Sequence, residues 1–350
     1  MTRSLRLCAS AAVGCFALVF AGTAFAAYNP SLLVAGTNHS LSRSAPVVIG
    51  LDRDDNDDAT GEVTFYSPRS YRVTLGQAPG IELGGISGQY QIGARGGAVV
   101  DIEGKIKTDN AANYVTNTCS PGAHEAVWVL EFTVEGNPMR IPIYVDRITA
   151  GPEAAYASAR MKLCLASPYL PPPQGAPSGA SLLVAAFSVR SVFTNPSARA
   201  SYAWNAIFTP YTPGSATLNP TLAAQSTSFV RLPVGFSVSA KRQRRGKTTF
   251  ALVTACLKEG GAGIRGVSVQ ILGGLTARGA KRVAGGRTNA RGCATTRVRV
   301  RTKTMVIAAF ADVPPRQASN CQPVIVARCS RPSVAPLFDL LSATAVRVKR

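Results

Sequence analysis

Hydrophobic and polar residues alternate along several short stretches of this chain, and the alternation predicts β-strands. In the stretch 99–107, charged residues occupy positions 101, 103, 105 and 107, whereas Val100, Ile102 and Ile106 lie between them. Because the side chains of a strand point alternately to its two faces, this strand has one apolar face and one face in water. The stretch 126–134 is almost continuously apolar, which predicts a strand buried on both faces.

Similar short runs rich in Val, Ile, Thr and Phe recur along the chain, broken by Gly, Pro and Asn, and helix signals are scarce. This spacing is typical of β-sandwiches. We therefore expect an all-β protein of tandem antiparallel β-sandwiches, one region spanning 27–232 and the other 233–350. A proline-rich linker is predicted at 171–179. The stretch 180–232 is short for an independent sandwich; it either forms a small domain or, as we expect, completes the first one.

The N-terminal 26 residues have the three parts of a secretory signal peptide. Arg3 and Arg6 precede a short apolar run, and Ala24-Phe25-Ala26 forms a cleavage site of the A-x-A kind. We expect cleavage before Ala27 and a secreted, extracellular protein, with association to the cell wall as one location. No later segment is long and apolar enough to predict a transmembrane helix.

Six cysteines remain after the predicted cleavage, and an even number in an exported protein predicts disulfides. They are Cys119, Cys164, Cys256, Cys293, Cys321 and Cys329. Six cysteines allow many pairings; sequential pairing is the simplest because each bond then stays within one segment. A zinc site is disfavoured because no Cys-x-x-Cys is present and the two histidines, His39 and His124, lie far from any cysteine pair.

The formal net charge of +20 is distributed unevenly. Residues 27–165 hold 11 Lys and Arg against 15 Asp and Glu, a balance of −4, whereas residues 166–350 hold 25 against 3, a balance of +22. Such asymmetry favours an anionic partner for the C-terminal half. The alternative is a compositional bias that serves solubility alone.

Two basic segments are the candidate binding site for that partner. Arg297, Arg299, Arg301 and Lys303 alternate with Val298, Val300 and Thr302, which places the four charges on one strand face about 6.7 Å apart. The second segment contributes Lys241, Arg242, Arg244 and Arg245. We expect binding to an anionic wall polymer or another surface polyanion. Nucleic acid is less favoured because no aromatic residue interleaves with the basic run to stack on bases.

An acidic stretch, 52–58, is the candidate metal site. It presents side-chain oxygens at alternate positions, Asp52, Asp54, Asn56 and Asp58, as calcium loops do. The sixth position of such a loop is Asp57 instead of Gly, and the twelfth is Val63 instead of Glu, so a single-loop cage fails. The remaining readings are an irregular Ca²⁺ site between strands and a solvated acidic turn. We expect no other cofactor.

The string Gly261-x-Gly263-x-x-Gly266 matches the fingerprint of dinucleotide-binding loops. That fingerprint requires a following helix, whose N–H groups meet the pyrophosphate. A strand-like segment, 267–271, follows here, so we expect a hairpin turn.

Catalytic motifs are scarce, and we expect no enzyme activity. Neither G-x-S-x-G nor H-E-x-x-H occurs. The alternative is a secreted carbohydrate-active or other hydrolase, whose paired carboxylates would come from Asp101, Glu103, Glu131 or Glu135.

The C-terminal third resembles a known family. The stretch 263–271, Gly-Ile-Arg-Gly-Val-Ser-Val-Gln-Ile, followed by Thr-Asn-Ala-Arg-Gly-Cys at 288–293, resembles bacterial immunoglobulin-like domains of the invasin or carboxypeptidase-regulatory type. Asn289 stands where the family usually has Asp, and Cys293 follows the turn glycine. The resemblance covers about 234–312 and implies an adhesive or spacer module. No family is recognised in 27–232.

Overall fold

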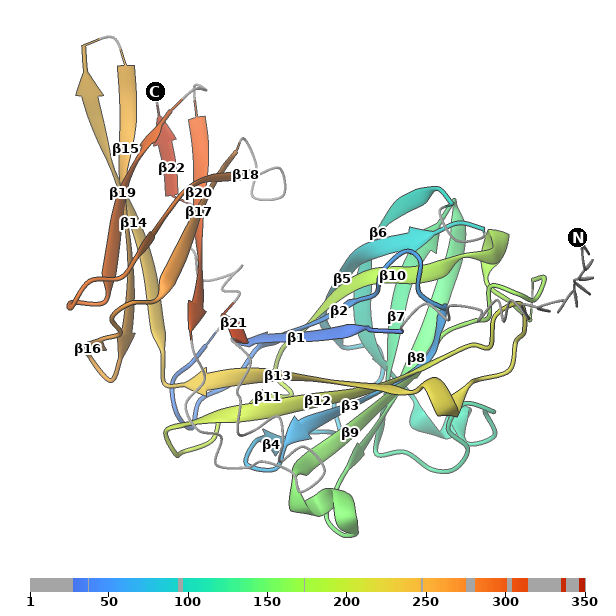
Figure 1. The fold of residues 1–350 in the computed structure, drawn as a ribbon. Coiled ribbons are helices and arrows are strands. Elements are labelled where there is room, and N and C mark those ends of the chain that lie inside the picture. The colour runs from blue at the N-terminus through green and yellow to red at the C-terminus, as the bar shows by residue number, and fades with distance from the viewer. Residues whose placement is uncertain are drawn as a thin grey trace, which may run out of the picture.

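A computed structural model describes residues 28–36, 38–93, 97–172, 174–246, 248–274, 281–300, 304–313, 335–337 and 346–349 (Figure 1). The predicted signal peptide, Arg301, Lys303 and the predicted pair of Cys321 and Cys329 lie outside these residues. The all-β prediction is confirmed, since all paired strands run antiparallel. The described helices are short 3₁₀ segments: η1 (Ala111–Tyr114), η2 (Pro152–Ala155), η3 (Pro177–Gly179) and η4 (Pro220–Leu222).

The first part of the chain forms one sheet of 11 strands in the order β1-β2-β10-β5-β6-β7-β8-β9-β3-β12-β13. Its strands are β1 (Ser31–Gly36), β2 (Val47–Asp52), β3 (Thr60–Pro68), β5 (Glu82–Gln91), β6 (Val99–Asp109), β7 (Ala126–Val134), β8 (Asn137–Arg147), β9 (Ala157–Cys164), β10 (Ser181–Val189), β12 (Ala200–Pro210) and β13 (Ala224–Leu232). A two-stranded ladder joins β4 (Arg72–Val73) to β11 (Phe193–Thr194). The sheet encloses one core, which includes Trp128, Trp204 and Phe65.

The apolar stretch 126–134 is β7, and both of its faces are covered. Trp128 and Leu130 point into the main core. Val127 and Val129 form a second small cluster with Tyr144, covered by Tyr114 of η1 and Cys119. Burial on both faces explains why the sequence does not alternate in this strand.

The two edge strands of this sheet meet, as Figure 1 shows for β1 and β13. Leu32 N–H donates to Ser226 Oγ at 2.9 Å, and Val34 N–H donates to Ser228 Oγ at 2.8 Å. Serine hydroxyls therefore accept hydrogen bonds from β1 N–H groups that would otherwise donate to the carbonyls of a further strand. The sheet thus rolls into a nearly closed layer.

The proline-rich segment 171–179 packs against the first core instead of separating two bodies. Ala176 is buried in that core, and its N–H donates to Ser167 O at 2.9 Å. After the segment, β10 inserts between β2 and β5, and β12 and β13 continue the same sheet. The predicted linker is thus an internal connection.

The C-terminal part forms two smaller sheets that pack face to face. One contains β14 (Gly235–Arg245), β15 (Thr248–Glu259), β16 (Ala262–Gly263) and β19 (Cys293–Arg299). The other contains β17 (Ser268–Gly274), β18 (Lys281–Arg287), β20 (Thr304–Val313), β21 (Ala335–Leu337) and β22 (Val346–Lys349). Between them lies a core of small residues, including Val253, Ala255, Ile271 and Ala309. The first core ends at Leu232 and this one begins at Val234.

The glycine-rich string forms a turn, as expected. Gly263 lies in β16, and Gly266 precedes strand β17 with a φ of 81°. None of the helices in the described part of the chain has the length and apolar character needed to cross a bilayer.

Candidate functional site

Strands β14, β15 and β19 bring the described residues of both predicted basic segments to one sheet. Lys241 pairs with Leu252 of β15, and Leu252 pairs in turn with Arg297 of β19. In the next row toward the hairpin end, Gln243, Phe250 and Arg299 stand opposite one another. Residues directly opposite in a ladder share a face. Lys241 and Arg297 therefore lie on the same face, about 10 Å apart across two strand spacings.

We call this surface the basic face and define it as Lys241, Arg245, Arg297 and Arg299. All four side chains are exposed. Arg245 belongs to it because it pairs with Thr248, two residues from Phe250 on the same side of β15.

The other two residues of the predicted basic segment point the opposite way. Arg242 pairs with Ala251 and Arg244 with Thr249, whose side chains are buried on the inner side of β15. Both arginines are nevertheless exposed. Figure 1 shows the reason, since the β14–β15 hairpin projects beyond the neighbouring strands. The structure thus splits this predicted group between two faces.

An aromatic ring lies within the basic face. The guanidinium of Arg297 is 5.8 Å from the ring centre of Phe250, a cation–π distance. Phe250 and Leu252 are half-buried between the charges of β14 and those of β19. The basic run contains no aromatic residue along the sequence, but the neighbouring strand supplies one, and only the strand pairing could have revealed it.

Carboxylates are rare around this face. The acidic residues after position 232 are Glu259, Asp312 and Asp339. Glu259 is buried and pairs with Arg231. Within the described ranges, no ion pair joins a carboxylate to any of the four residues of the basic face. Their charge is therefore available to a partner.

The Cys256–Cys293 disulfide lies on the same sheet and fixes the register of the basic face. The two cysteines stand directly opposite each other in β15 and β19, with their Cα atoms 4.0 Å apart. Four residues further along β19 is Arg297. The bond joins two strands of one sheet, and it holds β19 at the register that sets Arg297 beside Leu252.

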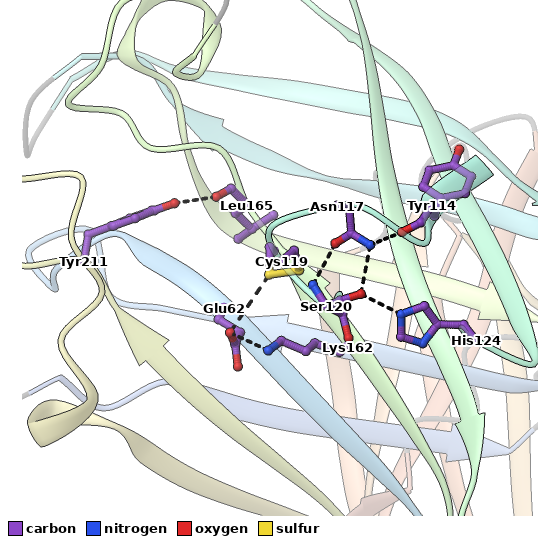
Figure 2. The surroundings of a disulfide bond; sticks show 10 residues. Glu62, Tyr114, Asn117, Cys119, Ser120, His124, Lys162, Leu165 and Tyr211 are labelled. Carbon is purple, nitrogen blue, oxygen red and sulfur yellow. Dashed lines mark hydrogen bonds and ion pairs between the residues drawn. A yellow bond between two sulfur atoms is a disulfide. The ribbon is translucent and has the colours of Figure 1, made fainter. Parts of the chain in front are cut away.

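The second disulfide, Cys119–Cys164, anchors the loop that follows η1 (Figure 2). Both pairs agree with sequential pairing. Within the loop, Asn117 Nδ2 donates to Tyr114 O and, at 2.8 Å, to Ser120 O, while Ser120 N–H donates to Asn117 Oδ1 at 2.7 Å. Side-chain bonds of this kind replace regular secondary structure in a loop.

His124 completes this loop, and both of its ring nitrogens are occupied. Nε2 lies 2.7 Å from Ser120 O, as Figure 2 shows, and Nδ1 lies 3.0 Å from Asp146 Oδ2. Its side chain is 4% exposed. A histidine enclosed in this way holds a loop, and it is poorly placed to act as a catalytic base.

The predicted metal loop is organised by an arginine. Arg53 is buried and donates to Asp57 O at 2.6 Å and to Ser181 Oγ at 3.1 Å. Asp54 Oδ1 accepts from Asn56 N at 3.0 Å, and this hydrogen bond lowers the pKa of Asp54, whereas burial raises the pKa of Asp52. Among the described residues, no three His, Cys, Asp or Glu side chains gather to hold a metal. Asp52, Asp54 and Asp58 are thus not brought together.

Three of the carboxylates considered for a hydrolase, those of Asp101, Glu103 and Glu131, lie on the outer face of the first sheet. Glu131 pairs with Lys107 at 2.7 Å and with Arg140 at 3.5 Å. Asp101 accepts from Gln89 Nε2 at 3.0 Å. Glu103, two residues from Asp101, shares its face, and Glu135 lies in the β7–β8 turn at a φ of 49°.

Comparison with known proteins found no matching protein family and no match among curated proteins. Among solved structures, the major pilin SpaD of Corynebacterium diphtheriae matches 83% of this chain and 58% of its own, at 7% identity and a TM-score of 0.26. A partial N-terminal region of the enterococcal surface protein matches 87% of both chains, at 7% identity and 0.22. Dimeric latent PorU from Porphyromonas gingivalis matches 82% and 33%, at 8% identity and 0.17. The chain spans little more than half of the pilin, and scores this low do not establish a shared fold.

Proposed function

We propose that this protein is an exported, non-catalytic surface or wall-associated protein whose basic face binds an anionic polymer. The signal-peptide pattern supports export. The two disulfides are typical of an oxidising compartment. The immunoglobulin-like resemblance of the C-terminal third supports a role as an adhesive or spacer module.

One observation carries the polymer part of the proposal: the register that places Lys241 of β14 level with Arg297 of β19. Cations from two strands then form a patch two strand spacings wide, with Arg297 and Arg299 repeating along it. An extended chain of phosphates or sulfates contacts several of these charges at once and releases its counterions. A compact anion would reach fewer of them.

The hydrolase alternative finds no comparable support. Glu131 is held in ion pairs and Asp101 in a hydrogen bond on an open sheet face, and His124 is enclosed. Calcium binding at 52–58 stays a prediction, to be tested by calorimetric titration of Ca²⁺ into the protein.

The proposal is tested by binding of the mature chain, 27–350, to poly(glycerol phosphate) over a salt series. We expect log K to fall linearly with log salt concentration, with a slope that reports the charges engaged. Arg297→Gln with Arg299→Gln should reduce that slope by about two. Arg282→Gln with Arg291→Gln is the matched control, because both residues are exposed outside the basic face.

Equal slopes in the two double variants would contradict the role of the basic face. Absence of binding at every salt concentration would rule out poly(glycerol phosphate) as a ligand. Heparin and single-stranded DNA form two further arms of the measurement, and binding that is tightest to single-stranded DNA would point to Phe250 as a base-stacking surface.

A further inference from the structure

A pocket of about 450 Å³ lies at one end of the first sheet, far in sequence from the basic face. It forms where the turn after β3 and strand β4 meet the end of β8 and the start of β9. Its wall includes three arginines, Arg69, Arg72 and Arg147, together with Thr149. The rest of the lining is largely apolar, with Val73, Ile148, Ala154 and Ala157.

The backbone around the three arginines is fixed by hydrogen bonds. Arg69 N–H donates to Tyr156 O at 2.8 Å, and a turn closes behind it where Tyr71 N–H donates to Pro68 O at 2.9 Å. Arg72 is held in the β4–β11 ladder opposite Thr194. Arg147 Nη2 donates to Val73 O at 3.3 Å, which ties the last residue of β8 to β4.

The positive charge of the pocket is largely unbalanced. None of its lining residues is acidic. Arg147 lies 3.6 Å from Glu125, in a pair whose side chains are both more than two-fifths exposed and which is therefore weak. Arg69 and Arg72 are exposed and form no ion pair with any described carboxylate.

The carboxylates nearest in sequence are engaged elsewhere. Asp146, beside Arg147, contacts His124 and Arg160. Glu153 of η2 accepts from Tyr66 Oη at 2.7 Å and pairs with Arg160 at 3.6 Å. Three guanidinium groups around one concavity repel one another, and the cost falls when an anion enters. This concentration of arginines occurs in the half of the chain whose balance is −4.

We propose that the arginine pocket, defined by Arg69, Arg72 and Arg147, binds a small organic oxyanion: a phosphate or carboxylate group on a short carbon skeleton. Guanidinium forks donate two parallel hydrogen bonds to such groups. Thr149 adds a hydroxyl, and the apolar wall accommodates the carbon skeleton. The volume lies within the range of small-molecule sites. Because a polymer would bind along an open face, this site is separate from the proposed polymer surface.

The test is calorimetric titration of the oxidised mature chain with inorganic phosphate, glycerol 3-phosphate and citrate at low salt. We expect binding of at least one of the organic anions, tighter than inorganic phosphate. Arg69→Gln with Arg72→Gln should weaken it by about tenfold or more. Arg72→Lys keeps the charge but loses the fork, and should produce a smaller loss. Arg297→Gln with Arg299→Gln serves as the control and should leave this binding unchanged, whatever its effect on polymer binding.

A second measurement avoids substitution altogether. Arginine modification by phenylglyoxal, mapped by peptide analysis, should be slowed at Arg69 and Arg72 by the organic anion and unaffected at Arg291. Equal affinity in wild type and the Arg69/Arg72 variant, or modification rates that no anion changes, would overturn the proposal. Tighter binding of inorganic phosphate than of the organic anions would overturn the role of the apolar wall.

Discussion

Arg231 of β13 and Glu259 of β15 form an ion pair in which Nη2 and Oε2 lie 2.5 Å apart, and this pair joins the two parts of the molecule. The two side chains are only 14% and 7% exposed. Arg231 directly precedes Leu232, the last residue of the first core, and Glu259 follows Leu257 of the second. A buried ion pair at this position links the 11-stranded sheet to the C-terminal sheets.

Substitution of either partner alone should destabilise the protein. Glu259→Gln or Arg231→Gln leaves one charge buried without its counterpart, and we expect a loss of about 3–5 kcal/mol in the free energy of unfolding. Replacing both, Arg231→Met with Glu259→Leu, should cost much less. Urea unfolding followed by tryptophan fluorescence reports the first core, which contains both Trp128 and Trp204. Single variants within about 1 kcal/mol of wild type would contradict a buried pair.

Stability should also fall in mild acid because of His39. Burial lowers the pKa of His39 to about 4 from 6.5, and Nε2 has no hydrogen-bond partner among the residues that the structure describes. Between these two pH values the unfolded chain binds a proton that the folded chain does not, so stability is lost as the pH falls from about 6.5 to 4. The full loss is about 3 kcal/mol.

His39→Phe should remove this component of the pH dependence. The measurement is the difference between wild type and variant in unfolding free energy at pH 7 and at pH 4.5, which cancels the carboxylates common to both. His39→Leu serves if the phenyl ring does not fit. A difference that stays constant with pH would contradict the lowered pKa.

Loss of the Cys256–Cys293 bond should impair both stability and polymer binding. Replacing both cysteines with serine removes a loop closure of 37 residues, which the chain-entropy model values at about 4 kcal/mol. Because the bond holds β19 beside β15, binding to poly(glycerol phosphate) should weaken as well. The same change at Cys119 and Cys164 is the control, with a similar loss of stability but no loss of binding. Equal polymer binding by both variants would show that the basic face does not need the Cys256–Cys293 bond.

The turn before Cys293 should discriminate sharply among substitutions. Asn289 Oδ1 accepts from Arg291 N–H at 2.9 Å and from Cys293 N–H at 3.1 Å. A carboxylate can accept the same bonds, so Asn289→Asp should be tolerated, whereas Asn289→Ala should cost about 1 kcal/mol. Gly292 has a φ of 75°, and a Cβ there would lie 2.1 Å from Leu257 O. Gly292→Ala should therefore be the most destabilising of the three in thermal unfolding; the reverse order would contradict this geometry.

The features that the sequence predicted are those set by neighbours along the chain. Alternation identified β6, and the continuous apolar run identified β7 as a strand buried on both faces. The turn at Asn289 and Gly292 follows from a short pattern of the same kind, and the two described disulfides agree with sequential pairing of the cysteines. The immunoglobulin-like resemblance, the third disulfide and the domain bounds stay predictions.

The features that could not be predicted from the sequence depend on which strands become neighbours in the sheets. Nothing local indicates that β10 inserts between β2 and β5, or that β15 places Phe250 beneath Arg297. The acidic stretch 52–58 resembles a metal loop in sequence because its oxygens alternate. That Arg53 organises this stretch could not be predicted, since Arg53 donates to Ser181, more than a hundred residues away. Likewise, Arg69 and Arg147 meet at one pocket only through the pairing of β3, β9 and β8.

The serines of β13 determine more than two hydrogen bonds. A row of backbone groups on an edge strand can recruit a strand from another molecule. Here the N–H groups of Leu32 and Val34 donate to hydroxyls, so these donors are satisfied by the residue type at two positions, 226 and 228, and not by main-chain pairing. Alanine at both would leave the same strands in place but remove the acceptors of these two N–H groups. Two small hydroxyl groups thus satisfy, within the chain, edge donors of the kind that recruit a strand from another molecule.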